Sequence, residues 1–300
     1  MPAYAFAVKA RGPRGSDVIV TSPPIKQLLR AFNPALMTMD LWRYRDLIRQ
    51  FTRREIEGRY KGSYFGLLWS FITPIVMLLV YTFVFGVVFK ARWPHERGGD
   101  SLAEFAVVMF AGQIAFQAFA EPVGRAAGLI VSVPNFVKKV VFPLQILPVA
   151  VVGAALYHVA IGLLIALVAS SVIFHTIPWT VLLVPLSLLP LAMLGLGLSW
   201  FLAALGVYLR DVGYIVGVIV QVLFFATPIF YPLSAIPEEY RWLMAMNPLT
   251  PMIDLVRGNL IFGVVGEPIV WMTAFIVGLV AMVLGYAWFM ITRKGFADVL

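Results

Sequence analysis

Long apolar runs constrain this chain more than any other feature of its sequence. A helix needs about 20 apolar residues to cross a hydrocarbon core of about 30 Å, and six runs approach or exceed that length. The predicted spans are residues 66–89, 103–121, 143–172, 178–207, 213–232 and 269–291. Because a bilayer core offers no water to backbone groups, each span must be helical. The expected fold class is all-α: a polytopic membrane protein with six transmembrane helices in one domain, residues 65–300.

Composition supports this class. Of the 300 residues, 61% are hydrophobic and 13% are charged, whereas soluble domains carry about 25% charged residues. The net charge is +8, and the positive residues are unevenly distributed, since 12 of the 23 Lys and Arg residues precede residue 66. This arrangement favours an anionic membrane surface as the partner and makes nucleic-acid binding a poor explanation.

The loops between the spans predict the orientation. With the N-terminus inside, 18 Lys and Arg residues lie on the inner side and 5 on the outer side. Positively charged loops stay on the cytoplasmic face. Both termini are therefore expected in the cytoplasm, with residues 122–142 as an inner loop and residues 233–268 as an outer segment.

Two segments precede the first span. Residues 1–39 contain five prolines and no helical period, which predicts a mobile cytoplasmic tail. Residues 40–64 fit an amphipathic helix in the cytoplasmic membrane interface, because four arginines between residues 45 and 54 lie on other faces than the apolar positions. Those positions are Tyr44, Leu47, Ile48 and Phe51. The alternative is a soluble helix packed on another protein.

Several chemical motifs are missing. The sequence has no G-x-x-x-x-G-K-[ST] phosphate loop, no H-E-x-x-H or G-x-S-x-G motif, and no cysteine. We therefore expect no catalytic residue, no metal and no cofactor in this chain. The spans also contain few acids, which weighs against an ion-coupled carrier. His158 is the one deep polar candidate, and a helix-packing hydrogen bond is its expected role.

Four segments carry a resemblance to a known family. Residues 54–63 (REIEGRYKGS), with GLLW at 66–69 and Pro74, resemble the start of the first span in ABC exporter permeases for O-antigen and teichoic acid. The other similar segments are residues 136–143, residues 210–215 through 227–232, and residues 247–251 with Arg257. The resemblance covers residues 42–300, in the family's order.

This resemblance implies that the chain is the permease subunit of an ATP-driven exporter. Such an exporter moves polysaccharide such as O-antigen, linked to undecaprenyl diphosphate, across a bacterial inner membrane. The family works as a homodimer with two copies of a separate ATPase, which binds ATP and Mg. The alternatives are a permease for capsule polysaccharide, a drug or a small lipid, or an ion-coupled carrier.

Basic residues near the first span are the candidates for binding the substrate head group. A diphosphate would be held by charge-assisted hydrogen bonds. The candidates are Arg54, Arg59, Tyr60 and Lys61. The same cations could instead anchor the helix to phospholipid phosphates.

Aromatic residues are the candidates for a polymer channel. The apolar C–H faces of sugars contact aromatic side chains, and Tyr81, Phe85 and Phe89 recur every four residues on the first span. Tyr214, Gln221 and Phe225 lie near one face of the fifth span. Helix packing or an interfacial aromatic belt is the competing explanation.

The resemblance also implies roles for the two long loops. Residues 128–136 would form a coupling helix that docks on the ATPase. The coupling candidates are Arg125, Gly128, Asn135, Lys138 and Lys139, unless these cations serve only as positive-inside signals. Residues 233–268 would form short re-entrant helices that close the exit, or else a structured surface loop. The candidates for this external gate are Tyr240, Trp242, Asn247, Pro248 and Arg257.

Overall fold

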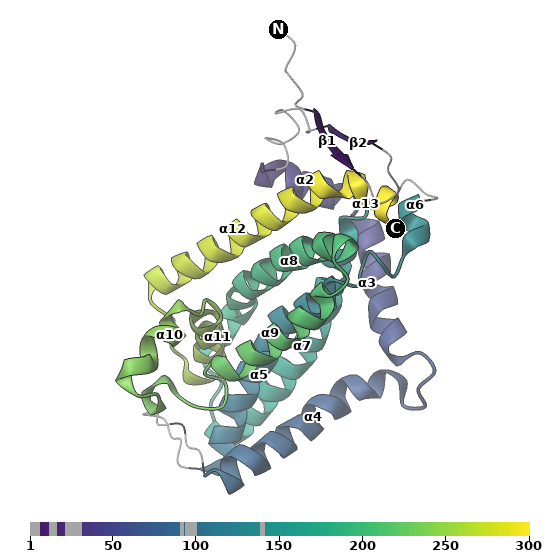
Figure 1. Cartoon of the computed structure of the whole chain (residues 1–300). Helices are drawn as coiled ribbons and strands as arrows, with labels where there is room; N and C mark the ends of the chain where they lie inside the picture. The colour runs from purple at the N-terminus through teal and green to yellow at the C-terminus, as the bar shows by residue number, and fades with distance from the viewer. Residues whose placement is uncertain (1–6, 12–16, 22–31, 91–92, 94–100, 139–141) are drawn as a thin grey trace.

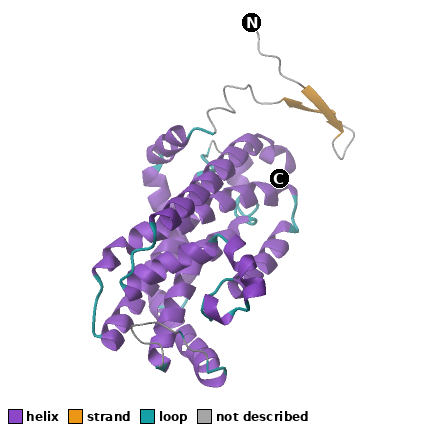
Figure 2. Ribbon diagram, turned by 90° about the vertical axis from the view of Figure 1, so that its left-hand side faces the viewer, coloured by secondary structure: helices purple, strands orange, loops and turns teal. Residues whose placement is uncertain are grey.

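The computed structural model describes residues 7–11, 17–21, 32–90, 93, 101–138 and 142–300. Within these ranges the regular elements are helices, apart from one antiparallel hairpin that the sequence did not predict (Figure 1). Strand β1, Ala7–Arg11, pairs with β2, Asp17–Thr21, in a register that places Val8 opposite Val20. Figure 2 shows this hairpin apart from the helices. The prediction of a helical fold is confirmed for the described residues from 34 onward.

Among the described residues, five helical segments are long and apolar enough to cross a membrane. Two of them are single helices, α5 (Leu102–Ala126) and α7 (Ile146–Phe174). The other three are composite: Gly66–Val88 consists of the 3₁₀ helix η1 (Gly66–Leu68), α4 (Trp69–Tyr81) and the π-helical η2 (Thr82–Val88), and Trp179–Tyr208 consists of η3 (Trp179–Leu183) and α8 (Val184–Tyr208). The last, Pro268–Val299, consists of α12 (Pro268–Thr292), η7 (Arg293–Gly295) and α13 (Phe296–Val299). These segments overlap five of the six predicted spans.

The predicted fifth span differs from the others. The run at 213–232 becomes α9, Val212–Ala226, which is apolar but only 15 residues long. It ends before Pro228, and residue 227 is extended. A proline disfavours helical backbone at the residue before it, so the helix stops short of the predicted boundary.

Shorter helices fill the two long loops. In the loop predicted to lie inside, α6 covers Pro134–Lys138. The segment predicted to lie outside contains η4 (Leu233–Ala235), η5 (Glu238–Tyr240), α10 (Arg241–Met246), α11 (Leu249–Arg257) and the π-helical η6 (Gly258–Phe262).

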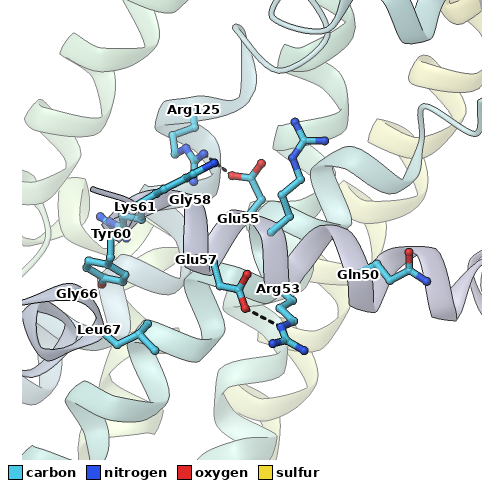
Figure 3. A pocket seen from close by; sticks show the side chains of 12 residues that line it. Gln50, Arg53, Glu55, Glu57, Gly58, Tyr60, Lys61, Gly66, Leu67 and Arg125 are labelled. Atoms are coloured by element: carbon cyan, nitrogen blue, oxygen red, sulfur yellow. Dashed lines mark hydrogen bonds and ion pairs between the residues drawn. The ribbon is translucent and has the colours of Figure 1, made fainter. Parts of the chain in front are cut away.

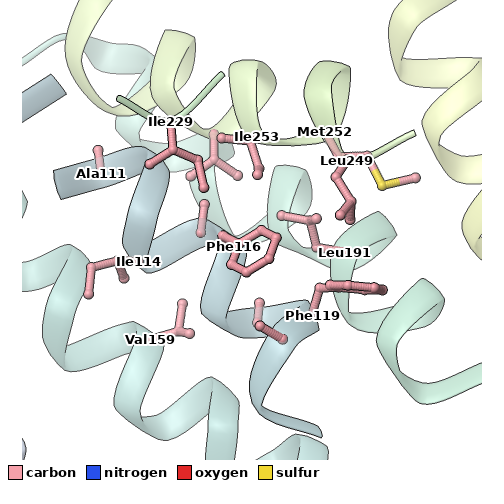
Figure 4. Packing of buried hydrophobic residues seen from close by; sticks show 14 of the residues in the cluster. Ala111, Ile114, Phe116, Phe119, Val159, Leu191, Ile229, Leu249, Met252 and Ile253 are labelled. Atoms are coloured by element: carbon pink, nitrogen blue, oxygen red, sulfur yellow. The ribbon is translucent and has the colours of Figure 1, made fainter. Parts of the chain in front are cut away.

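Helix α5 forms the centre of the core. Phe105, Phe110 and Phe116 on this helix are at most 1% exposed. Their neighbours come from α7, α8, α9 and α11, and Figure 4 shows Phe116 and Phe119 among Leu191, Leu249 and Ile253. Elsewhere, α8 and α12 touch through their backbones, because Gly285 leaves no room for a Cβ beside Gly197. Small residues allow this close approach between membrane helices.

Two helices lie before the first span: α2, Pro34–Arg43, and α3, Arg45–Tyr60. Asn33 caps α2 through its side chain, and Met37 is buried against the bundle. Asp40 accepts hydrogen bonds from Gln145 and Tyr286, each at 2.9 Å. The helical body therefore starts at Pro34, within the segment that the sequence assigned to the tail, and the predicted boundary at residue 40 was too late.

Candidate functional site

A groove of about 1060 Å³ lies along the end of α3 and the turn that follows it. Five basic and two acidic side chains line it (Figure 3). The lining residues are Gln50, Arg53, Arg54, Glu55, Glu57, Gly58, Arg59, Tyr60, Lys61, Gly66, Leu67 and Arg125. All four predicted head-group residues thus line one open groove. An excess of positive charge in a concave surface concentrates anions.

Two of the five cations are neutralised inside the groove. Arg53 pairs with Glu57 at 2.6 Å and Arg125 pairs with Glu55 at 2.5 Å (Figure 3). Neither Arg54 nor Lys61 forms an ion pair with a described residue, and both are exposed. These two cations carry the unbalanced charge of the groove.

The inner end of the groove is a charge cluster between three helices. Nη1 of Arg59 donates to Oε1 of Glu121 at 2.7 Å and to Nδ1 of His158 at 2.9 Å. Nδ1 of His158 also lies 3.5 Å from Oε2 of Glu121, so this ring nitrogen faces both the guanidinium and the carboxylate. Arg59 comes from α3, Glu121 from α5 and His158 from α7. The cluster therefore ties the interface helix to two spans.

Tyr60 lies beside this cluster. Its ring meets the His158 ring edge-on, with 5.9 Å between ring centroids. Burial raises the pKa of the Tyr60 phenol above its usual value. The phenol therefore stays neutral and remains a hydrogen-bond donor at physiological pH.

Local sequence explains how α3 reaches this position. Phe51 on its apolar face packs against Phe136 and Phe142, with centroid distances of 6.0 and 5.2 Å. The neighbouring Thr52 fills the space beside Gly153 of α7. Beyond Tyr60 the chain turns at Gly62, whose φ of +86° lies in the left-handed region that favours glycine. The apolar face of the predicted amphipathic helix is thus covered, at least in part, by its own chain.

The predicted channel aromatics do not share one environment. Phe85 stacks on Phe230 at 4.4 Å, and Tyr81 meets the same ring at 5.5 Å. Phe230 is only 2% exposed, so these contacts are helix packing. By contrast, Phe89 is 68% exposed. The remaining candidates are exposed on α9: Tyr214, Gln221 and Phe225.

The predicted coupling residues are divided in the same way. Arg125, at the end of α5, faces the groove and pairs with Glu55 rather than projecting alone. Gly128, Asn135 and Lys138 are exposed around α6. Lys139 lies outside the described residues.

The predicted gate residues also differ in burial. Tyr240 and Trp242 are exposed, whereas Asn247, next to Pro248, donates to Thr227 at 2.9 Å and accepts a hydrogen bond from the N–H of Leu249. Arg257 is 1% exposed.

Arg257 joins α11 to α5. Its guanidinium donates to the Val108 carbonyl at 3.3 Å and to the Pro228 carbonyl at 3.1 Å, and it pairs with Asp254 at 2.8 Å. It also lies over the Trp93 ring at 4.3 Å. These contacts give Arg257 a structural position inside the protein, whatever its part in a gate.

Sequence reasoning missed the partners in two polar networks. Glu121 was not among the candidate residues, and His158 was expected to form a helix-packing hydrogen bond without a named partner; both bind Arg59. Asp40 and Gln145 drew no attention, although they connect α2 to the bundle. The available signal was polarity within or beside apolar spans, which marks residues that need partners.

Comparison with known proteins assigns the family. The sequence profile described as ABC-2 type transporter matches residues 46–261. The chain is 33% identical over 219 residues to the O-antigen export system permease protein RfbA of Myxococcus xanthus, covering 72% of this chain and 81% of the relative. It is 26% identical over 257 residues to RfbA of Klebsiella pneumoniae, covering 85% and 95%, and 25% identical over 217 residues to the polysialic acid transport protein KpsM of Escherichia coli, covering 71% and 81%. The chain belongs to the ABC-2 type transporter family.

Proposed function

We propose that this chain is the permease subunit of an ATP-driven exporter that moves polysaccharide linked to undecaprenyl diphosphate across the bacterial inner membrane. The observation that carries the proposal is the basic groove at the entrance to an apolar helix bundle, in which Arg54 and Lys61 lack a carboxylate partner among the described residues. Two free cations complement a diphosphate. The RfbA relatives, named as O-antigen export permeases, support the polysaccharide as cargo.

The energy source lies outside this chain. The sequence contains no phosphate loop, so ATP and Mg would be bound by a separate ATPase, present in two copies. Gly128, Asn135 and Lys138 form an exposed inner surface around α6 on which an ATPase can dock. A homodimer of this chain would cover the exposed faces of α4 and α9, and the polymer would pass between the two copies along Phe89, Tyr214, Gln221 and Phe225.

The proposed topology has six spans. Helix α9 serves as the fifth span although it has only 15 residues, because short spans are accommodated by local bilayer thinning. The short helices α10 and α11 would re-enter the outer interface as the external gate. With the excess of Lys and Arg inside, both termini lie in the cytoplasm.

The test is direct binding of undecaprenyl diphosphate to the purified transporter. We expect the double variant Arg54→Gln/Lys61→Gln to lose at least tenfold in affinity, because both free cations are removed. Arg49→Gln on the same helix is the matched control: it removes one exposed charge outside the groove lining and should leave the affinity within twofold. Equal binding by the double variant and the wild type would refute the proposal.

Capsule polysaccharide is the second candidate cargo, and the similarity to KpsM favours it. Genetic complementation distinguishes the two candidate cargoes. Restored O-antigen at the surface of a strain that lacks its O-antigen permease would support the first candidate, and restored capsule in a capsule-permease mutant would support the second.

A further inference from the structure

A second cavity lies directly inside the basic groove. It has a volume of about 210 Å³, is partly open, and is lined by the end of α3 and by α4, α5 and α7. Arg59 and Tyr60 line both the groove and this cavity. Its volume corresponds to about seven molecules of liquid water at ~30 Å³ each, so it is larger than a site for one bridging water. The groove therefore adjoins this second cavity, the chamber, at Arg59 and Tyr60.

Two side chains present unused hydrogen-bonding groups beside this cavity. Gln113 on α5 is 6% exposed, and its Oε1 has no hydrogen-bond partner among the described residues. Nε2 of His158 is likewise buried without a partner in the described part of the chain. Both residues line the cavity. Buried polar groups in native proteins are nearly always hydrogen-bonded, so an exception calls for an occupant.

The chemistry of the two groups specifies that occupant. Nε2 of His158 donates or accepts according to the tautomer of the ring, while Oε1 of Gln113 is an acceptor. A hydroxyl group both donates and accepts, so a ligand with several hydroxyls satisfies both. The charges of Arg59 and Glu121 neutralise each other at 2.7 Å. The chamber therefore favours an uncharged ligand over a second anion.

The remaining walls suit the same kind of ligand. Trp69, Pro74 and Met77 contribute apolar surface, and Thr73 and Gln117 add polar groups. A sugar ring combines apolar C–H faces with hydroxyl edges. A mixed lining of this kind therefore matches a pyranose better than it matches a lipid tail.

We propose that this chamber binds the sugar that is attached to the lipid diphosphate, while the basic groove holds the diphosphate itself. The inference rests on the proposed function and names the part of the substrate that each surface recognises. Gln113 and His158 would then distinguish glycosylated carrier lipid from bare carrier lipid before export begins.

The experiment compares two probes on the purified permease with its partner ATPase, in the absence of nucleotide. The probes are undecaprenyl diphosphate and the same lipid carrying one N-acetylglucosamine. We expect the wild type to bind the glycosylated lipid about tenfold more tightly, a difference equivalent to about 1.4 kcal/mol. Gln113→Met keeps the side-chain length but removes the amide. It should erase this preference and leave the affinity for the bare lipid unchanged.

Ser199→Ala is the matched control. Ser199 is a buried polar residue in α8 whose Oγ also lacks a partner among the described residues, but it does not line the chamber. This variant should keep the tenfold preference. Should Gln113→Met fail to accumulate in the membrane, Gln113→Leu supplies the same readout with a branched side chain.

The outcomes separate this inference from the proposed function. Tight but equal binding of both lipids by the wild type would mean that the chamber holds only water, which overturns the inference and leaves the groove's role intact. A preference that survives in Gln113→Met would also overturn it. Failure to bind either lipid would refute the proposed function, and the inference with it.

Discussion

The segment Gly66–Val88, which contains α4, and helix α5 are consecutive apolar segments of similar length, 23 and 25 residues, with opposite surroundings. In the most apolar stretch of Gly66–Val88, which contains α4, 6% of the residues are buried, against 78% in that of α5. Yet α5 is the more polar of the two, with Glu104, Gln113, Gln117 and Glu121 along its length. In a water-soluble protein the more apolar helix would be the more buried one.

The difference reflects the solvent. Lipid tails are as apolar as leucine, so an apolar side chain gains little by moving from lipid into the protein. A polar side chain gains much, because only the protein offers it partners. Helix α5 is therefore the natural centre of the bundle, and α4 is the helix left at its surface.

The largest expected effect tests this contrast through packing. Phe116→Ala on α5 should reduce the free energy of unfolding by about 3–5 kcal/mol, because it empties a fully enclosed position. Leu79→Ala on α4, where the side chain is 64% exposed, should change it by about 0.5 kcal/mol or less. Thermal unfolding of the purified variants in detergent provides the measurement. Equal destabilisation by both changes would mean that α4 is covered as completely as α5.

A smaller effect is expected where α5 is held by polar contacts. Arg257→Met removes the hydrogen bonds to Val108 and Pro228 and should lower stability by about 3 kcal/mol. Arg241→Met breaks an exposed ion pair with Glu238 and should cost less than about 1 kcal/mol. The same unfolding assay compares the two variants. If Arg257→Met is as mild as the control, apolar packing alone positions α11 on α5.

The smallest effect on stability is expected for substitutions at exposed positions, which test by labelling whether α5 crosses the membrane at all. The chain has no cysteine, so single substitutions at exposed Lys90 and Ser132, on either side of α5, have no background. In intact spheroplasts, a membrane-impermeant maleimide should label Lys90→Cys, whereas Ser132→Cys should react only after permeabilisation. Labelling of both positions from outside would show that α5 does not cross, and the comparison with α4 would fail.

Much of the fold follows from local sequence. Residues 66–89 and 269–291 predict helices because apolar runs of that length have no other way to satisfy their backbone groups in lipid. The helix before the first span was equally predictable from its apolar positions, since Phe51 and its neighbours repeat with the helical period. The end of α9 was misplaced, because apolar character continues past Thr227 while the proline at 228 ends the helix.

In the candidate site too, the sequence identified individual residues but not their arrangement in space. Arg54, Arg59, Tyr60 and Lys61 were identifiable from the sequence because they are close together in the chain and similar to a family motif. Their arrangement into a groove with Arg125 was not, since Glu55 and Arg125 are 70 residues apart.

The sequence by itself determined the class of this protein, the approximate place of its apolar helices and the positive charge of the segment before the first of them, because hydropathy and charge are properties of consecutive residues. Only the tertiary structure decided which span is central, which cations are free, and that Arg59, Glu121 and His158 meet. Those outcomes depend on distances between residues that are far apart in the chain, such as the 99 positions between Arg59 and His158. A buried polar side chain signals in the sequence that it needs a partner, but packing alone selects the partner.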